Sequence, residues 1–234
     1  MPTHRQRIAL VLLLGVLPLL ACSTLSTALG QPGGTAIPDN SPVGSIVMPP
    51  PHVWPHPDGT ALGSKTAPVV VQEFADFQCP ICKEYASSVE PRLIQDYVAT
   101  GKIRYEWHSF IVIDGNVGGV ESRHAAEASL CANAQERFWD YDSLLYSNQQ
   151  GEHSGAFRDP RLKAFAVALG LDSAQFNTCF DTHQYASVVD ADQALATQKN
   201  IAGTPTLLIN GVIANNALDY PSLQKQINQA LGQQ

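Results

Sequence analysis

Runs of apolar and β-branched side chains predict two strands and one helix in the first half of the chain. Residues 68–74 are almost continuously apolar, which is typical of a buried strand. Residues 103–110 alternate between apolar and polar side chains, which also indicates a strand. The segment between them has apolar residues at helical spacing, namely Ile81, Tyr85, Val89, Leu93 and Tyr97. We expect Pro91 to kink this helix rather than end it, and Gly101 to stop it.

The middle of the chain, residues 118–199, is rich in alanine and predicts a block of helices. Helical patterns cover residues 123–131, 138–148, 160–169 and 174–181. Asp172 is a good N-cap for the last of these helices, and Gly170 is a good end for the one before it.

The C-terminal part returns to strands. Apolar residues 206–209 and 212–214 flank Asn210-Gly211, a pair that is typical of a tight hairpin because both residues tolerate positive φ. A final amphipathic helix has apolar residues four positions apart, namely Leu223, Ile227 and Leu231. The hairpin makes its two strands antiparallel, so we expect a mixed sheet with helices on its faces, an α/β fold.

Composition and charge narrow the class of protein. Hydrophobic residues make up 44% of the 234 residues, which is enough for a packed core. The formal net charge is −7, whereas a nucleic-acid binder needs a basic face to meet phosphates. We therefore expect no nucleic-acid partner.

The N-terminus resembles an export signal followed by a lipidation site. Basic residues precede an apolar run over residues 8–20, which is too short to span a bilayer. The run ends in LLAC at residues 19–22, which resembles the lipobox of bacterial lipoproteins. We expect residues 1–21 to be a signal peptide and Cys22 to be lipidated, so that the rest lies in an oxidising compartment. The alternative is an ordinary signal peptide with an incidental cysteine.

A tether is predicted between this signal and the globular part. Residues 22–58 contain eight of the 16 prolines, mixed with glycine, serine and threonine. Such a composition buries too little apolar surface to order itself. We expect residues 22–58 to be a flexible tether that begins with the lipidated cysteine and holds the globular part near a membrane.

The cysteine pair in CPIC, at residues 79–82, carries the predicted chemistry. It follows a strand and opens a helix, so Cys79 lies at a helix N-terminus, where free backbone N–H groups favour a thiolate. The thiolate attacks disulfides, and Cys82 lies one turn further along the helix, where it can resolve a mixed disulfide. The alternatives are half of a zinc site and a purely structural disulfide.

These residues resemble the DsbA-like branch of the thioredoxin superfamily. The motif is EFxDFxCPxC over residues 73–82, followed far downstream by GTPT at residues 203–206. The resemblance implies a thioredoxin-like domain over residues 59–117 and 200–234, with an inserted all-α domain over residues 118–199. It also implies a cis bond between Thr204 and Pro205, beside the redox pair, where these residues bind the substrate chain.

Two further positions follow from the same resemblance. Glu73 corresponds to the buried acid under the redox pair, which moves a proton during exchange. The alternative is a strand residue that reaches solvent at an edge. Ile81 stands where strongly oxidising relatives often have histidine, and it cannot stabilise the Cys79 thiolate. We therefore expect the pKa of Cys79 to be lowered less than in those relatives, and the couple to be less oxidising.

Cys131 and Cys179 both fall in the helical block. In an oxidising compartment we expect them to form a structural disulfide, as in some DsbA-like relatives. The alternative is two buried free thiols, because cysteine packs well in cores.

The expected function is thiol–disulfide exchange on exported proteins, most simply the introduction of disulfides. No cofactor or metal is expected, because the dithiol itself carries the electrons. The resemblance implies a quinone-linked membrane redox partner, and the anchor places the enzyme on the extracytoplasmic face of a bacterial membrane. A reductase or isomerase of the same fold is one alternative. Another is a copper-binding lipoprotein, which would need a ligand such as His108 near the cysteines.

Overall fold

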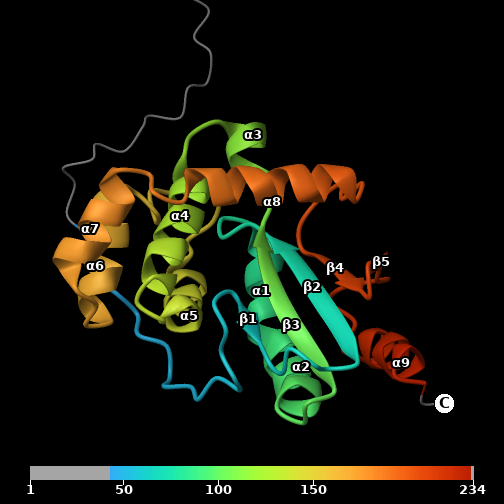
Figure 1. The fold of residues 1–234 in the computed structure, drawn as a ribbon. Helices are drawn as coiled ribbons and strands as arrows, with labels where there is room; N and C mark the ends of the chain where they lie inside the picture. Colours follow the sequence, from blue (N-terminus) through green and yellow to red (C-terminus); the bar gives the residue numbers. More distant parts are fainter. Residues whose placement is uncertain (1–42, 233–234) are drawn as a thin grey trace, which may run out of the picture. The chain divides into compact units, whose positions relative to one another are not determined.

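The computed structural model describes residues 43–232 and contains a five-stranded mixed sheet (Figure 1). The strand order is β1-β3-β2-β4-β5, with β2 and β3 parallel and the other pairs antiparallel. The strands are β1 (Ala61–Leu62), β2 (Val69–Ala75), β3 (Ile103–Ser109), β4 (Thr206–Ile209) and β5 (Val212–Ile213). The mixed α/β architecture predicted from the sequence is confirmed. β1 was not predicted, because a strand of two residues has no recognisable period.

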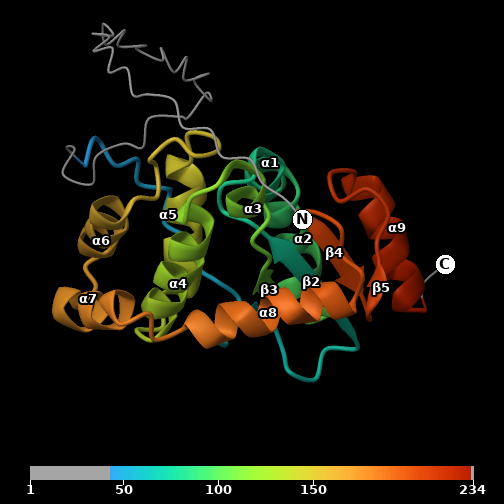
Figure 2. The same ribbon diagram turned by 90° about the horizontal axis from the view of Figure 1, so that it is seen from above.

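Helices cover both faces of this sheet. The helices are α1 (Pro80–Ser88), α2 (Glu90–Leu93), the π-helix η1 (Ile94–Val98), α3 (Ile113–Val117), α4 (Glu121–Asn133), α5 (Phe138–Asn148), α6 (Asp159–Ala168), α7 (Ser173–Asp181), α8 (Ala186–Gln198) and α9 (Tyr220–Ala230). Figure 2 shows α8 along one face of the sheet, with α1 and α2 on the other. Side chains alternate accordingly, so that Val71 packs in the large core with α1 and Phe74 packs with Ala196 of α8.

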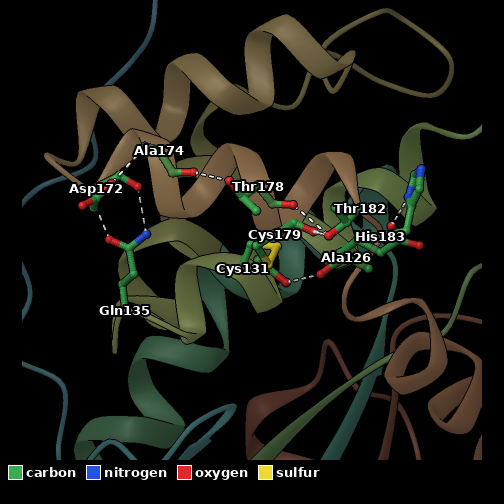
Figure 3. The surroundings of a disulfide bond; sticks show 11 residues. Ala126, Cys131, Gln135, Asp172, Ala174, Thr178, Cys179, Thr182 and His183 are labelled. Atoms are coloured by element: carbon green, nitrogen blue, oxygen red, sulfur yellow. Dashed lines mark hydrogen bonds and ion pairs between the residues drawn. A yellow bond between two sulfur atoms is a disulfide. The ribbon is translucent and has the colours of Figure 1, made fainter.

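The helices α3 to α8 stand between β3 and β4 in the chain, and α4 to α7 gather beside the sheet in both views (Figures 1 and 2). The helical insertion expected from the sequence is therefore present. A disulfide joins Cys131 of α4 to Cys179 of α7 (Figure 3). The two helices also meet where the Gln135 side chain exchanges two hydrogen bonds with the Asp172 backbone, at the start of α7 (Figure 3).

The predicted helix around Pro91 differs from the expectation. The sequence interpretation was one kinked helix, but the structure ends α1 at Ser88 and begins α2 at Glu90, with η1 continuing to Val98. Proline has no N–H, and its ring clashes with the carbonyl four residues earlier, so the regular helical hydrogen bonding is interrupted here. Val89, which keeps a right-handed helical conformation, is the single residue between α1 and α2. Pro91 instead lies in the first turn of α2, where proline is tolerated.

The described end of the predicted tether also differs from the expectation. Residues 43–58 have no regular secondary structure except a bridge at Asp58, yet they pack on the helical insertion. The Arg161 guanidinium donates hydrogen bonds to the carbonyls of Val43 and Ser45. The Trp54 indole donates to Asp140 at 3.0 Å. A tether that is flexible up to residue 58 is therefore wrong for this stretch, because long-range contacts supply the order that its composition lacks.

Candidate active site

The cysteine pair lies where β2 passes into α1, as the sequence predicted. Cys79 is the N-cap residue of α1 and Cys82 lies one turn along the helix. Both are free thiols; Cys79 is 6% exposed and Cys82 is fully buried. The outer sulfur alone is therefore accessible to a second protein, while the inner one can react only with a sulfur already attached to Cys79.

The two thiols have opposite acidities. The pKa of Cys79 is lowered to about 6, most strongly by its hydrogen bond with the Cys82 side chain. The Thr204 side chain and the backbone N–H groups at the start of α1 lower it further, against the opposing effect of burial. Burial raises the pKa of Cys82, and the neighbouring Cys79 raises it too. Cys79 is thus a thiolate at neutral pH, whereas Cys82 holds its proton.

We expect the ultraviolet absorbance of the reduced protein to titrate with a midpoint near 6 for Cys79. Because the hydrogen bond from Cys82 is the largest cause of this shift, the variant Cys82→Ala should move the midpoint up towards the ordinary cysteine value of about 8.5. A midpoint below about 4, the level of the most acidic known thiols, would contradict the effect expected of Ile81.

The segment that contains Thr204 and Pro205 lies beside Cys79. The Thr204–Pro205 peptide bond is cis, as the resemblance implied. The Cys79 sulfur lies 3.4 Å from the Thr204 carbonyl oxygen, to which it donates a hydrogen bond in its protonated form. The fold thus brings together two segments that are 125 residues apart in the chain.

Glu73 lies beneath the pair on the central strand β2. Its side chain is 2% exposed, and it belongs to the face of the sheet covered by α1. Burial raises the pKa of Glu73 to about 7, although the hydroxyl of Tyr105 donates a hydrogen bond of 2.5 Å to its carboxylate. The negative charge of Glu73 raises the pKa of Cys82, so the protonation states of the two groups depend on each other. A solvent-facing position at a sheet edge is therefore excluded, and the carboxyl can exchange a proton near neutral pH.

Asp76 holds the redox loop, although the sequence analysis gave it no role beyond the motif. Its buried carboxylate accepts hydrogen bonds from the backbone N–H groups of Gln78, Val112 and Ile113, each at 2.9 Å. Its backbone carbonyl accepts one from the N–H of Cys79 at 3.0 Å. An aspartate between a strand and a CxxC motif was the available signal, because such a side chain often orders a turn.

Gln149, at the end of α5, fixes the same loop from the helical insertion. Its side-chain amide donates to the carbonyls of Phe77 at 2.6 Å and Cys79 at 3.0 Å, and it is buried. Nothing in the local sequence marks this residue, because its partners lie about 70 positions earlier. The redox loop is therefore held by both parts of the fold.

The variant Gln149→Leu is expected to lower the free energy of unfolding by about 1–3 kcal/mol, because the Phe77 carbonyl loses this donor while the Cys79 carbonyl keeps the Lys83 N–H at 3.2 Å. Urea unfolding would measure this change. Gln150→Leu is the matched control, since Gln150 is exposed and should change stability little. Equal stabilities of the two variants would show that the loop does not depend on Gln149.

Other residues singled out in the sequence lie elsewhere. The Cys131–Cys179 disulfide is in the helical insertion, and His108 bonds Asp192 at 2.9 Å and stacks on Phe74. Within residues 43–232 no group of three or more histidine, cysteine or acidic side chains is arranged to hold a metal ion.

No helix in the described part of the chain is long and apolar enough to cross a membrane. Residues 1–21 and Cys22 lie outside the described residues.

Comparison with known proteins agrees with this geometry. A protein-family model described as thioredoxin matches residues 56–229. Disulfide bond formation protein D of Bacillus subtilis is 26% identical over 171 residues, which cover 73% of this chain and 76% of the relative. The crystal structure of oxidised BdbD from Bacillus subtilis matches with a TM-score of 0.68 and 27% identity, covering 77% of this chain and 98% of that one. Wolbachia pipientis alpha-DsbA1 shares the fold, with a TM-score of 0.64 at 22% identity over 77% of this chain and 94% of that one.

The fold and the asymmetric dithiol define the class of protein, a thiol–disulfide oxidoreductase. The chain belongs to the thioredoxin family, within its DsbA-like branch.

Proposed function

We propose that this oxidoreductase is an oxidase that introduces disulfides into exported proteins, with Cys79 and Cys82 as its catalytic pair. The observation that carries the proposal is the contrast between the two thiols. An acidic outer cysteine stabilises the reduced enzyme as a thiolate, which makes the oxidised enzyme a better electron acceptor. The pKa of Cys79, about 6, lies between the values of thioredoxin, about 7, and DsbA, about 3.5, and so on the more oxidising side of thioredoxin.

The reaction follows from the burial of the pair. A substrate thiolate attacks the Cys79 sulfur of the oxidised enzyme, the Cys79–Cys82 bond breaks, and Cys82 leaves with the two electrons of that bond. Because burial disfavours a thiolate at Cys82, it takes a proton, and we assign Glu73 as the donor. A second substrate thiolate then attacks the first substrate sulfur, a substrate disulfide forms, and Cys79 leaves as a thiolate.

Thr204 and Pro205 are the proposed substrate-binding residues. Their segment lies against the Cys79 sulfur, so a chain joined to Cys79 would run beside it. An extended substrate can pair with the peptide groups there in the manner of an added strand. Because this pairing uses backbone groups, it does not depend on the substrate sequence, which suits an enzyme that acts on many unfolded chains.

The cellular setting is part of the same proposal. Residues 1–21 act as the export signal, Cys22 carries the lipid, and the enzyme stays on the extracytoplasmic face of a bacterial membrane. A quinone-linked membrane protein re-oxidises the pair. Labelling of the full chain with a fatty-acid analogue in a bacterial host tests the anchor, with Cys22→Ala as the matched control. Equal labelling of the two forms would contradict the lipid site.

The reduction potential of the Cys79–Cys82 couple tests the direction of electron flow. A protein that starts after Cys22 would be equilibrated in glutathione buffers, and its thiols would be alkylated and scored by mass. An oxidase should have a potential between about −230 and −120 mV, above that of thioredoxin. A value near −270 mV would instead indicate a reductase. If no reversible disulfide forms and the reduced protein binds copper stoichiometrically, the copper-binding alternative would be correct.

A further inference from the structure

Two buried acids that interact electrostatically with Glu73 have no part in the exchange chemistry described above. They are Glu90 of α2 and Asp142 of α5, which are 6% and 2% exposed. With Glu73 they form three buried carboxyls from three different elements, here termed the carboxyl cluster. We propose that Glu90 and Asp142 form a proton relay between Glu73 and solvent. The inference rests on the proposed role of Glu73 as the proton partner of Cys82.

Burial and mutual repulsion favour the protonated forms of the carboxyls in the cluster. Burial raises the pKa of Glu90 well above its ordinary value, and both Asp142 and Glu73 raise it further. Burial, and then Glu73, raise the pKa of Asp142 in the same way. Three carboxyls that act on one another in this way cannot all be ionised at neutral pH. The titratable groups facing the cluster are Cys82 and Tyr85 of α1, Tyr105 of β3 and Tyr146 of α5.

The Tyr105 hydroxyl connects two members of the cluster, Glu73 and Glu90. The Tyr105 hydroxyl donates to Glu73 at 2.5 Å and lies 3.2 Å from the Tyr85 hydroxyl. The same hydroxyl also acts on Glu90, whose pKa it lowers. Tyr105 therefore stands between the acid near Cys82 and the acid of α2.

The cluster has an outlet to the surface. A pocket of about 260 Å³ is lined by Glu90, Asp142 and Tyr146, but not by Glu73. Its wall also includes His52 and Lys83, the ionisable groups at its rim. Asp142 Oδ1 and the Tyr146 hydroxyl are buried and have no hydrogen-bond partner within the described part of the chain. Buried polar atoms without a protein partner are, as a rule, hydrogen-bonded by ordered water, which would extend a proton path from the pocket.

The proton balance of the relay is as follows. Cys82 loses its proton to the Glu73 carboxylate when it resolves a mixed disulfide. The Glu73 carboxyl passes a proton to the Tyr105 oxygen while Tyr105 gives its own to the carbonyl oxygen of Glu90. Glu90 releases its original proton to water in the pocket, either directly or to Asp142 as Asp142 gives up a proton to that water, and Tyr105 ends neutral. The reverse sequence supplies the proton when Cys82 is the leaving group.

The test measures the step in which Cys82 gives up its proton. The reduced protein would be joined to glutathione at Cys79, and release of glutathione by Cys82 would be followed between pH 5 and 9. The variants are Glu90→Gln, Asp142→Asn and the double variant, because an amide keeps the shape but cannot relay a proton. Glu84→Gln is the matched control, since Glu84 is an exposed acid of α1 outside the cluster.

At pH 7 the double variant should release glutathione roughly tenfold more slowly than the native protein. This is less than the roughly 10²–10⁴-fold effect of a direct general acid or base, because Glu90 and Asp142 act through Glu73. Imidazole buffer, small enough for the pocket, should restore the rate in proportion to its concentration in the double variant alone. A structural defect would not be rescued by buffer. Native rate and pH profile in the double variant would overturn the relay. If the double variant does not fold, Asp142→Asn alone is tested, with about threefold slowing expected and the native rate again overturning the relay.

Failure of the relay and failure of the oxidase proposal are distinguishable. Resolution by Cys82 occurs in both directions of electron flow, so the release rate reports the relay in an oxidase or a reductase. The reduction potential of the native protein reports the direction alone. A slow, buffer-rescued double variant with a thioredoxin-like potential would keep the relay and reject the oxidase.

Discussion

The variant Cys79→Ser is expected to lose thiol–disulfide exchange by about 10³-fold or more, down to the rate of the uncatalysed reaction. The reactive species is a thiolate, and the pKa of Cys79, about 6, makes it available at neutral pH. A serine hydroxyl is not ionised there and forms no disulfide. The measurement is oxidation of a reduced, unfolded protein by the oxidised enzyme, followed by loss of free thiols.

The variant Cys82→Ser should fail in a different way. Cys79 remains and still reacts with a substrate disulfide, but no inner thiol resolves the product, so a mixed disulfide with the substrate accumulates. Mass measurement under denaturing, non-reducing conditions would detect it. Glu84→Gln is again the control and should exchange at the native rate. Activity retained in Cys79→Ser would refute the assignment of the pair, as would a Cys82→Ser variant that accumulates no adduct.

Removal of the Cys131–Cys179 disulfide should have the largest effect on stability. The bond joins residues 48 positions apart, and both sulfurs are buried between α4 and α7. A native bridge of this span contributes about 2–5 kcal/mol, largely by restricting the unfolded chain. For a chain of this size, each kcal/mol shifts the melting temperature by roughly 2–4 °C. The variant Cys131→Ala/Cys179→Ala should therefore melt on the order of 10 °C lower.

Calorimetry of the double alanine variant would measure this shift. Thr178→Ala is the matched control, because it lies next to Cys179 on α7 and removes only an exposed hydroxyl contact to Ala174 (Figure 3). Its melting temperature should change by a few degrees at most. The reduction potential of the Cys79–Cys82 couple should stay unchanged. An unaltered melting temperature in the double alanine variant would show that the bridge does not stabilise the fold.

The sequence predicted the parts of the fold that depend on neighbouring residues. Asp172 caps α7 through two backbone N–H groups, as its position before a helical pattern indicated. Asn210 and Gly211 both have positive φ and form the hairpin between β4 and β5. The helix over residues 138–148 begins and ends where its pattern predicted. Each of these features is decided within a few residues, so a single sequence contains the necessary information.

The break before Pro91 shows where such local reading is insufficient. The apolar spacing continues through Val89 and Leu93, so it predicted one helix, whereas the missing N–H and the proline ring divide it. α3 was missed because its five residues include glycine and asparagine, which are poor helix formers. α8 was not singled out, because its buried positions are few and do not form a clear stripe.

By itself, then, the sequence determined the strands around the CPIC motif, the helical insertion and the reactive pair, because spacing and turn chemistry act over short distances. The tertiary structure alone decided which distant groups surround that pair. Gln149, Glu90 and Asp142 look like ordinary helix residues in the sequence. Only tertiary packing buries Gln149 against the Cys79 carbonyl, and Glu90 and Asp142 where they interact with Glu73. The physical reason is that burial and electrostatic coupling depend on contacts between segments far apart in the chain, which no local pattern records.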